Sequence, residues 1–542
     1  MEPRYAGRRR DRWKFKATAP AWIAVLLLGV AVPRASASLT NEALMDSLQH
    51  SAFRFFWEQA NPTNGLIKDR SASWSPCSIA STGFGLSAIC IGVDHGWVSR
   101  ADAAARVRTT LNTFWTGPQG TGASGFIGYK GLFYHFLDMT TATRTWTCEV
   151  STIDSALLFA GMLDAQQYFD GADPVELEIR QLADSIYYRA DWEFFRNGYA
   201  GILMGWKPGT GFSGFGQWIG YNEAMILYFL ALGSPTHPVP TFTWNAWTSG
   251  YDWLTYYGFT YVNFPPLFGH QYSHCWVDFR FIRDTYMTTQ GITYFENSRR
   301  ATLAQREYCI ANPAGWTGYG RDLWGITASD DPSGYSARGA PPPQNDNGTL
   351  VPTAPASSIP FAPAECLACL HNLYDNYRTQ LWGPYGFRDA FNLTVNWWGP
   401  DYIGIDQGPI IIMIENYRTG GPWTRIQQNT DLQVGLTRAG FVFDPASTPP
   451  PMLATPVLTL APAAPNPFRE ATTLRFRLPE SGSTRLFLTD AAGREVLRLV
   501  DGVLSPGDHQ VTLPGDRLAS GVYYSTLVHG DRVVRQPCVL IR

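Results

Sequence analysis

The feature that most constrains the fold is a series of stretches in which apolar residues recur at helical spacing, between residues 39 and 443. The clearest are NEALMDSLQHSAFRFFWEQA, ADAAARVRTTLNTFW, VSTIDSALLFAGMLDAQQYF, PVELEIRQLADSIYYRA, NEAMILYFLALG, AECLACLHNLYDNY and GPIIIMIENYRTG. Several begin with Asn, Ser, Asp or Pro, residues that commonly start helices. Helices paired into a closed ring, an α/α toroid, would bury this apolar surface and leave a loop-lined mouth. The periodicity fits an open α-solenoid equally well.

Beyond residue 443 the pattern changes. DPASTPPPMLATP, residues 444–456, predicts an extended linker, because clustered prolines block both helix and sheet. Residues 457–542 contain short alternating runs such as TTLRFRLPE, TRLFLTD and GVYYSTLVHG, bounded by turn residues. We therefore predict a mainly α region at 38–443, followed by a small all-β antiparallel sandwich.

Residues 1–37 have the layout of a secretory signal peptide. A basic stretch precedes the apolar run AWIAVLLLGVAV, which is followed by the small residues Ala35, Ser36 and Ala37. The apolar run is short for a bilayer span, so a retained anchor is the less favoured alternative. We expect cleavage near Ala37 and an exported protein, extracellular, cell-surface or periplasmic, with no stable membrane span.

The amino-acid composition limits the kinds of partner that the exported chain can bind. Without residues 1–37 it has 34 basic and 43 acidic side chains, a poor match for nucleic acid or an anionic membrane. Charged residues are only 16% of the chain, against about 25% in typical proteins, while aromatics reach 14% with 20 Trp. Such flat rings suit stacking on sugars, although a large aromatic core would use many of them too.

No motif for a metal or a cofactor stands out. Cys366 and Cys369 form a CxxC, but they sit in a helix-periodic segment, so we interpret them as helix-core thiols. His270 and His274 are four apart, yet Gln271 stands where an HExxH zinc site needs Glu. We expect neither a catalytic metal nor a cofactor, and a structural calcium ion remains open.

Acidic residues recur where loops meet predicted helices. Glu149 and Asp154 lie in TWTCEVSTIDSALL, Glu223 in GQWIGYNEAMILYFL and Asp406 in YIGIDQGPIII. Each could simply cap its helix N-terminus. In a helical ring, however, such junctions can lie at one end, where their carboxylates would converge on a cleft.

Glu223 has the most informative neighbours. Aromatic and polar residues precede it, and an acid among rings is desolvated, which raises its pKa. Glycoside hydrolysis needs such a protonated acid beside an ionised partner. The sequence therefore indicates a sugar-cleaving cleft.

At these motifs the chain resembles a known family. EVSTIDSALLFAG, WIGYNEAMILYFLALGSP, GHQYSHCWVDFR, YGRDLWGITASDDPSGY, PFAPAECL, GFRDAFN and YIGIDQGPIIIMIENYRTG resemble, in this order, the bacterial glucoamylase-like domain family, whose characterised members include endo-β-1,2-glucanases. The resemblance covers about residues 40–442. It implies an (α/α)6 toroid and a secreted glycoside hydrolase that acts on β-1,2-glucan with inversion.

The resemblance also implies roles for individual residues. Glu223 would be the general acid and Asp406 the base, with Glu149 as a further acid of the groove. In related enzymes the base is thought to reach its water through a substrate hydroxyl, which allows a long separation between the two carboxylates. The residues expected to bind sugar are Asp154, Arg144, Trp206, Trp218, Tyr221, Asn222, His270, His274, Arg321, Asp322, Trp324, Trp397, Trp398 and Gln407.

Two alternatives stay open for the larger region: a hydrolase or transglycosylase for another β-linked glucan or oligosaccharide, and a catalytically silent glycan-binding protein. The C-terminal region resembles the sorting or FlgD-like immunoglobulin-type domains of secreted bacterial proteins, through NPF, AAGREV and ASGVYY. That resemblance implies contact with export or surface-attachment machinery. A sugar-binding module is the alternative, weakened by the few aromatic residues in this region.

Overall fold

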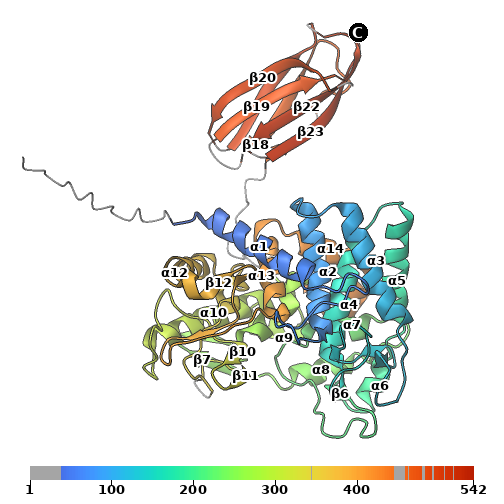
Figure 1. Ribbon diagram of the computed structural model, residues 1–542, viewed down its shortest axis with the longest axis vertical. Coiled ribbons are helices and arrows are strands. Elements are labelled where there is room, and N and C mark those ends of the chain that lie inside the picture. The colour runs from blue at the N-terminus through green and yellow to red at the C-terminus, as the bar shows by residue number, and fades with distance from the viewer. Residues whose placement is uncertain are drawn as a thin grey trace, which may run out of the picture. The chain divides into compact units, whose positions relative to one another are not determined.

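The computed structural model describes residues 38–342, 345–444 and 458–541, apart from 462, 479–481, 491–492, 506, 517 and 531 (Figure 1). The predicted signal peptide, residues 1–37, lies outside the described residues, as does the predicted linker apart from Asp444. The predicted domain boundaries therefore stay predictions. No helix among the described residues is long and apolar enough to cross a membrane.

Helices dominate residues 41–438. Their N-termini follow the expected chemistry, since the Thr40, Ser78, Ser99, Ser151 and Asp173 side chains each accept a backbone N–H at a helix start. The helices are α1 (Asn41–Glu58), α2 (Ile79–Asp94), α3 (Arg100–Thr116), α4 (Thr152–Tyr168), α5 (Pro174–Tyr188), α6 (Trp192–Arg196), α7 (Met225–Gly233), α8 (Phe242–Thr248), α9 (Thr285–Gln290), α10 (Tyr294–Ala311), α11 (Thr353–Ala356), α12 (Pro363–Leu381), α13 (Gly404–Arg418), α14 (Gly421–Ile426) and α15 (Thr430–Arg438). Two short 3-10 turns, η1 (Leu267–His270) and η2 (Ser273–Cys275), lie between α8 and α9.

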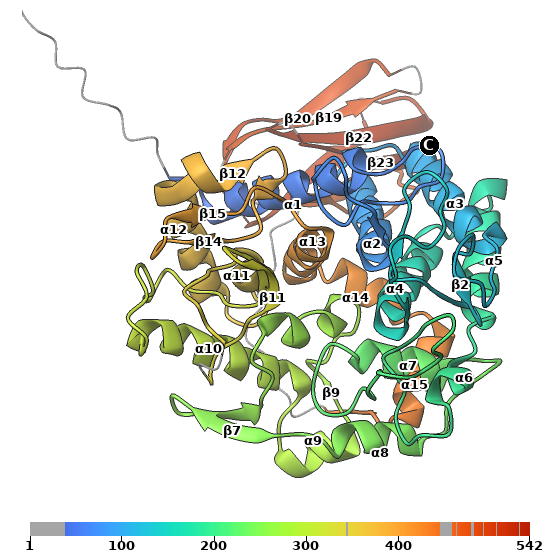
Figure 2. The same cartoon turned by 60° about the horizontal axis from the view of Figure 1, so that its bottom comes forward.

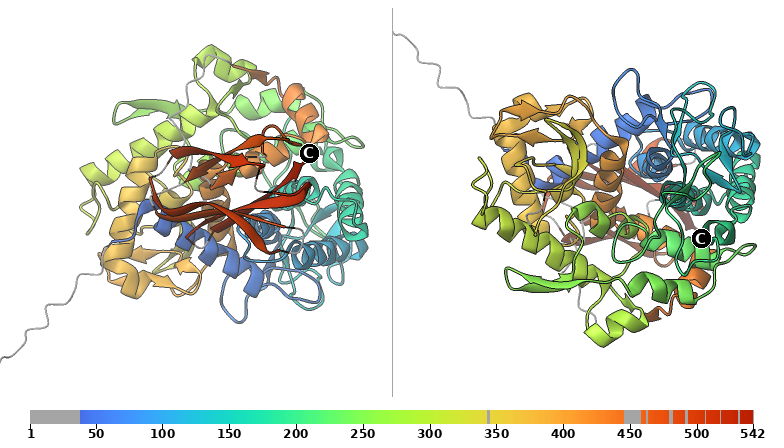
Figure 3. Two further views of the ribbon diagram at one scale, coloured as in Figure 1. Left: turned by 90° about the horizontal axis from the view of Figure 1, so that it is seen from above. Right: turned by 90° about the horizontal axis from the view of Figure 1, so that it is seen from below.

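The helices α13, α2, α4 and α7 form an inner series in which each packs against the next (Figure 2). They are buried almost all round, because their sequences are apolar on every face. The outer helices α1, α3, α5 and α15 pack against them and keep an exposed face. In Figure 3, right, the inner helices are seen nearly end-on.

Glycine allows the closest contact in this inner series. A Cβ on Gly161 of α4 would lie 1.9 Å from the Gly83 carbonyl oxygen of α2, so only glycine fits there. This close approach holds the first turns of α2 against the middle of α4. Both helices start at a serine, Ser78 and Ser151, that lines the cavity described below.

Short antiparallel pairs of strands connect the helices and shape the loops at their ends. They are β1 (Cys77–Ser78) with β4 (Phe136–Leu137), β2 (Gly128–Tyr129) with β3 (Leu132–Phe133), β5 (Val150–Ser151) with β6 (Gly205–Trp206), β7 (Trp253–Tyr256) with β8 (Phe259–Val262), β9 (Ile282–Arg283) with β16 (Val442–Phe443), β10 (Ala328–Asp331) with β11 (Gly334–Ala337), β12 (Trp382–Gly383) with β13 (Gly386–Phe387), and β14 (Phe391–Asn392) with β15 (Trp397–Trp398). The pairing of β1 with β4 places residues 133–137 beside the start of α2.

The C-terminal region is rich in strands and has a buried cluster of its own. Leu474, Leu486, Leu488, Leu513 and Leu527 are fully buried in that cluster. The strands are β17 (Thr459–Leu460), β18 (Ala471–Leu478), β19 (Gly482–Thr489), β20 (Glu495–Leu504), β21 (Gly507–Pro514), β22 (Gly521–His529) and β23 (Arg532–Leu540). They form two antiparallel sheets, in the orders β17-β18-β21 and β20-β19-β22-β23.

The cysteines agree with their interpretation as core residues. All eight are buried and free. Cys366 and Cys369 both lie on α12, inside one hydrophobic cluster, and neither sulfur lies at a cavity-lining position.

Candidate active site

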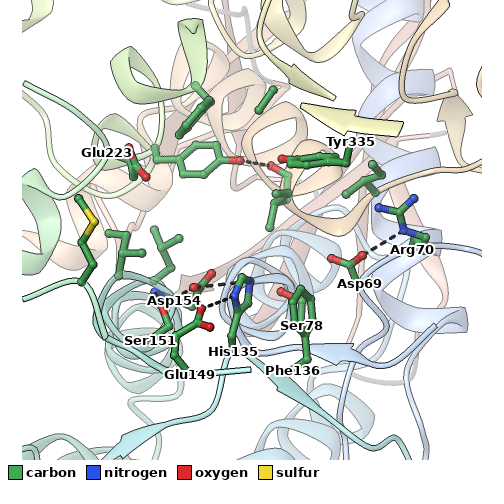
Figure 4. Close-up of a pocket in the computed structure, with 18 of the residues that line it drawn as sticks. Asp69, Arg70, Ser78, His135, Phe136, Glu149, Ser151, Asp154, Glu223 and Tyr335 are labelled. Atoms are coloured by element: carbon green, nitrogen blue, oxygen red, sulfur yellow. Dashed lines mark hydrogen bonds and ion pairs between the residues drawn. The ribbon is translucent and has the colours of Figure 1, made fainter. Parts of the chain in front are cut away.

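Loops and helix starts from several parts of the helical region surround a cavity of about 670 Å³ (Figure 4). Its walls come from residues 69–78, 135–157, 204–223, 268–272, 328–335 and 403–405. Apolar and aromatic side chains make up much of the lining, with a few carboxyl groups, one histidine and one arginine among them. An apolar pocket with a few converging polar groups is the usual form of a small-molecule site.

Glu223 lies on one wall of this cavity, two residues before α7. Its side chain does not cap the helix, because the Asn222 side chain accepts the Ala224 N–H at 2.9 Å instead. The surrounding wall is apolar and aromatic, with Phe215, Trp218 and Phe268 among its members. Burial in this wall, with a smaller contribution from the Asp154 charge, raises the pKa of Glu223 to about 7. Glu223 can therefore hold a proton near neutral pH.

Glu149, Asp154 and His135 lie together across the cavity from Glu223 (Figure 4). His135 Nδ1 is 3.0 Å from Glu149 Oε1, and His135 Nε2 is 3.6 Å from Asp154 Oδ2. Burial alone would lower the pKa of His135, but the charges of Asp154 and Glu149 raise it to about 9. The imidazolium thus lies between two carboxylates at neutral pH.

The same histidine keeps Glu149 ionised. Burial favours the protonated form of Glu149, yet the hydrogen bond and the charge of His135 outweigh burial and lower its pKa. Asp154 is held by a reciprocal cap at the start of α4: its N–H donates to Ser151 Oγ at 3.3 Å, and that hydroxyl donates to Asp154 Oδ2 at 2.5 Å. Asp154 is therefore both part of a helix cap and a cavity carboxylate.

Asp69 and Arg70 form a further part of the lining. Arg70 reaches Asp69 at 3.1 Å and Asp330 of β10 at 2.8 Å, so it ties the loop before β1 to the β10–β11 hairpin. Burial raises the pKa of Asp69 against the opposing charge of Arg70. Tyr335 of the same hairpin also faces the cavity (Figure 4).

Two tryptophans of the cavity lining are widely exposed. Trp74 is 66% exposed and Trp146 is 60% exposed, unlike the buried rings deeper in the wall. Trp146 has a φ of 54°, in the left-handed region that favours glycine, and its ring packs edge-on against Phe136. Residues held in backbone conformations that cost free energy cluster at functional sites.

Asp406 is in the first turn of α13, as predicted, but it is not one of the residues that line the cavity. Its neighbours Ile403 and Ile405 line the wall, and Asp406 itself is 6% exposed. Burial raises the pKa of Asp406 above its usual range. Its carboxyl group interacts with that of Asp389, and each changes the pKa of the other.

Most of the other predicted sugar-binding residues are buried and are not among the residues that line this cavity, so their roles stay predictions. His270 Nε2–H donates to the Phe264 carbonyl oxygen at 3.2 Å, and His274 Nε2 shares a hydrogen bond with Ser298 Oγ at 3.0 Å. Burial lowers the pKa of both histidines, to about 3 for His270. The other buried members of this group are Trp206, Tyr221, Asn222, Trp324 and Gln407, of which Tyr221 packs among core rings and Gln407 donates to the Phe387 carbonyl. These residues support the walls and do not touch the cavity.

A second group is more accessible but is also absent from the cavity lining. Arg144 donates to the carbonyls of Cys148 and Ala123, which fixes the loop that carries Glu149. Trp397 and Trp398 form β15, where Trp398 stacks on Phe391. Arg321 and Asp322, the two residues before Leu323, are exposed. Of the predicted site residues, the structure thus brings together Glu223, Glu149, Asp154 and Trp218.

Comparisons with known proteins fit this helical architecture and its cavity. The family model described as "Putative glucoamylase" matches residues 216–430, a range that includes Glu223 and Asp406. A crystal structure from Bacteroides uniformis, named a "putative glucoamylase", is 37% identical with a TM-score of 0.70, and the match covers 75% of this chain and 98% of that one. The chain therefore belongs to the glucoamylase-like family.

Two relatives have names that state an activity. The endo-beta-1,2-glucanase from Chitinophaga pinensis, solved with sophorotriose and glucose, is 29% identical with a TM-score of 0.69, over 75% of this chain and 99% of that one. The exo beta-1,2-glucooligosaccharide sophorohydrolase (non-reducing end) of Parabacteroides distasonis is 31% identical over 433 residues, 74% of this chain. The chain spans 58% of the length of that relative.

Proposed function

We propose that this protein is a glycoside hydrolase that cleaves β-1,2-glucan. One observation carries the proposal: Glu223 has a pKa raised to about 7 in an apolar wall, across the cavity from Glu149, a carboxylate whose pKa His135 lowers. A protonated acid opposite ionised carboxylates is the arrangement that glycoside hydrolysis needs. The substrate class comes from relatives named as β-1,2-glucan enzymes.

In this proposal Glu223 is the general acid. Its carboxyl proton passes to the glycosidic oxygen as the bond from that oxygen to C1 breaks, so the leaving sugar departs as a neutral alcohol. A water molecule attacks C1 from the opposite face, and the product therefore has the α configuration at the new reducing end. The surrounding aromatic wall excludes water from Glu223 and keeps the proton in place before reaction.

Asp406 is the proposed base, and Glu149 and Asp154 are proposed to bind the sugar beside it. Since Asp406 lies behind the residues that line the cavity, its carboxylate takes the proton of the attacking water through a substrate hydroxyl. Trp74 and Trp146 then provide exposed faces on which flanking glucose rings stack. We also propose that the helical region is an (α/α)6 toroid, which the pairwise packing of the inner helices supports.

We propose internal cleavage as the mode of action. The endo-acting relative is matched over 99% of its length, whereas the exo-acting relative is matched over only 58% of its length. Release of a disaccharide from the non-reducing end is the second candidate, favoured by the name of that exo-acting relative. We further propose that the protein is exported and that residues 457–542 serve export or surface attachment.

A linkage panel tests the proposal. Purified protein is incubated with β-1,2-, β-1,3-, β-1,4- and β-1,6-glucan, and new reducing ends and product sizes are measured. We expect activity on the β-1,2-linked polymer alone, with a broad range of early products for internal cleavage and one disaccharide for exo action. Binding to β-1,2-glucan without any new reducing ends would mean that the protein is a glycan-binding protein and not a hydrolase.

A further inference from the structure

A pair of buried carboxyl groups, Asp389 and Asp406, lies next to the cavity but outside its lining. Asp389 stands between β13 and β14 and is 3% exposed, while Asp406 in the first turn of α13 is 6% exposed. The two carboxyl groups lie close enough for each to change the pKa of the other. A hydrogen bond between them requires a proton on one of the two groups, because an ionised carboxylate can only accept.

The remaining oxygens point to the same conclusion. Asp389 Oδ2 accepts the Asp330 N–H at 2.8 Å, but Asp389 Oδ1 has no hydrogen-bond partner among the described residues. Asp406 Oδ2 is likewise enclosed and has no partner in the described part of the chain. Buried polar atoms without partners are costly, and a single proton shared between the two carboxyl groups would pair both.

The surrounding charges decide which residue keeps the proton. Burial raises the pKa of Asp406 to about 7, with further increases from the charges of Asp330 and Asp69, while its interaction with Asp389 and the charge of Arg70 act in the opposite direction. The interaction between the two residues has the reverse effect on Asp389, because burial, the Asp406 charge and the contact with Asp406 all raise its pKa. Asp69 also faces Asp406, and the phenols of Tyr335 and Tyr272 lie within the field of Asp406. Burial and like charge therefore raise the pKa of Asp389 well above its usual range.

We propose that Asp389 is a positioning residue for Asp406: it stays protonated and donates a hydrogen bond that holds Asp406 ionised and correctly oriented to accept a proton from the reacting water. This role rests on the proposed function of Asp406 as the base. The hydrogen bond from Asp389 to Asp406 takes no part in proton transfer, since the proton on Asp389 stays there throughout the reaction. Within this pair, each catalytic cycle moves only the proton that Asp406 receives and then returns to solvent, while Glu223 regains from solvent the proton that it gave to the leaving group.

The chain offers a close test of this role. Asp389→Asn keeps a carbonyl oxygen to accept the Asp330 N–H and adds an amide that donates to Asp406, so it imitates the protonated acid. Asp389→Ala removes both contacts. Asp375→Asn, on the exposed surface of α12, is the matched control for the Asp-to-Asn change.

The pH dependence of kcat/KM on β-1,2-glucan is measured for all four proteins, after their melting curves show that each is folded. We expect Asp389→Asn to stay within about threefold of wild type, and Asp389→Ala to lose tenfold or more, with the acid limb of its profile moved to higher pH. The loss arises because Asp406 without a donor is harder to ionise.

Two results would overturn the role of Asp389. One is an Asp389→Asn variant as impaired as Asp389→Ala, and the other is an Asp389→Ala variant whose acid limb coincides with that of wild type. A wild-type protein that cleaves no β-1,2-glucan is a separate result: it refutes the proposed function, and the role of Asp389 falls with it.

Discussion

Glu223 and Glu149 are both glutamates at loop-to-helix junctions that face one cavity, yet their surroundings act on them in opposite directions. Glu223 has rings and aliphatic side chains around it, and burial raises its pKa to about 7. Glu149 is also partly buried, but His135 at 3.0 Å outweighs burial and lowers its pKa. The comparison shows that one nearby imidazolium decides whether a buried acid holds a proton or a charge.

The largest effect is expected where the acid itself is removed. Glu223→Gln keeps the shape of the side chain but has no proton to give, so kcat on β-1,2-glucan should fall by about 10²- to 10⁴-fold with little change in KM. A nitrophenyl β-1,2-linked glucoside, whose leaving group needs no protonation, should lose far less. Equal losses on both substrates would mean that Glu223 is not the acid.

The next effect concerns stability rather than rate. The pKa of Glu223 rises from an ordinary 4.5 to about 7 in the folded chain, so its contribution to stability is present at low pH and is lost as pH rises through this window. Glu223→Gln avoids that loss, and its melting temperature relative to wild type should increase from pH 5 to pH 8. The gain in free energy of unfolding is at most about 3 kcal/mol.

The control for this comparison is Glu178→Gln on the exposed face of α5. Its melting temperature relative to wild type should stay level over the same pH range. A Glu223→Gln curve as level as that of Glu178→Gln would show that the apolar wall does not raise the pKa of Glu223.

On the opposite wall, His135→Gln removes the cation but leaves a hydrogen-bond donor. Without the imidazolium, Glu149 loses the hydrogen bond and the charge that lower its pKa and takes up a proton more readily, so kcat/KM near pH 7 should fall about tenfold to a hundredfold. His237→Gln, at an exposed position after α7, is the matched control and should behave as wild type. Wild-type kinetics in His135→Gln would show that the imidazolium does not determine whether Glu149 holds a proton or a charge.

The smallest effect is expected at the outer edge of the cavity. Trp146→Ala removes an exposed ring that is proposed to stack on a glucose unit, and KM should rise about threefold to tenfold while kcat stays within about twofold. Trp115→Ala, which removes a ring 41% exposed on α3 and outside the cavity lining, should leave both constants unchanged. A drop in kcat alone for Trp146→Ala would point to a structural role.

Helices could be predicted from the sequence because their signals are local. Apolar spacing and the side chains of Ser78, Ser99 and Ser151 mark helices that the structure contains. The expected rise in the pKa of Glu223 agrees with its burial, whereas its role as the acid stays a prediction. The competing explanation, helix capping, is excluded for Glu223 by the Asn222 side chain and holds in part for Asp154.

The rest of the site depends on contacts between distant segments. His135 has no motif around it, and it reaches Asp154 because β4 pairs with β1 beside the starts of α2 and α4. Arg70 and Asp330 are 260 positions apart in the chain. Trp206 and Trp324, predicted to bind sugar, are buried, and the sequence could not indicate this because large rings fill a core as readily as they line a groove.

The ionisation of Glu223 tests the central claim most directly. Infrared spectra of wild type minus Glu223→Gln isolate the carbonyl band of one protonated carboxyl group, which can be followed from pH 4 to pH 9 without any substrate. We predict that the band loses half of its intensity near pH 7. A band that disappears near pH 4.5, the ordinary value for a glutamate, would show that Glu223 is ionised at neutral pH and is not the acid of this site.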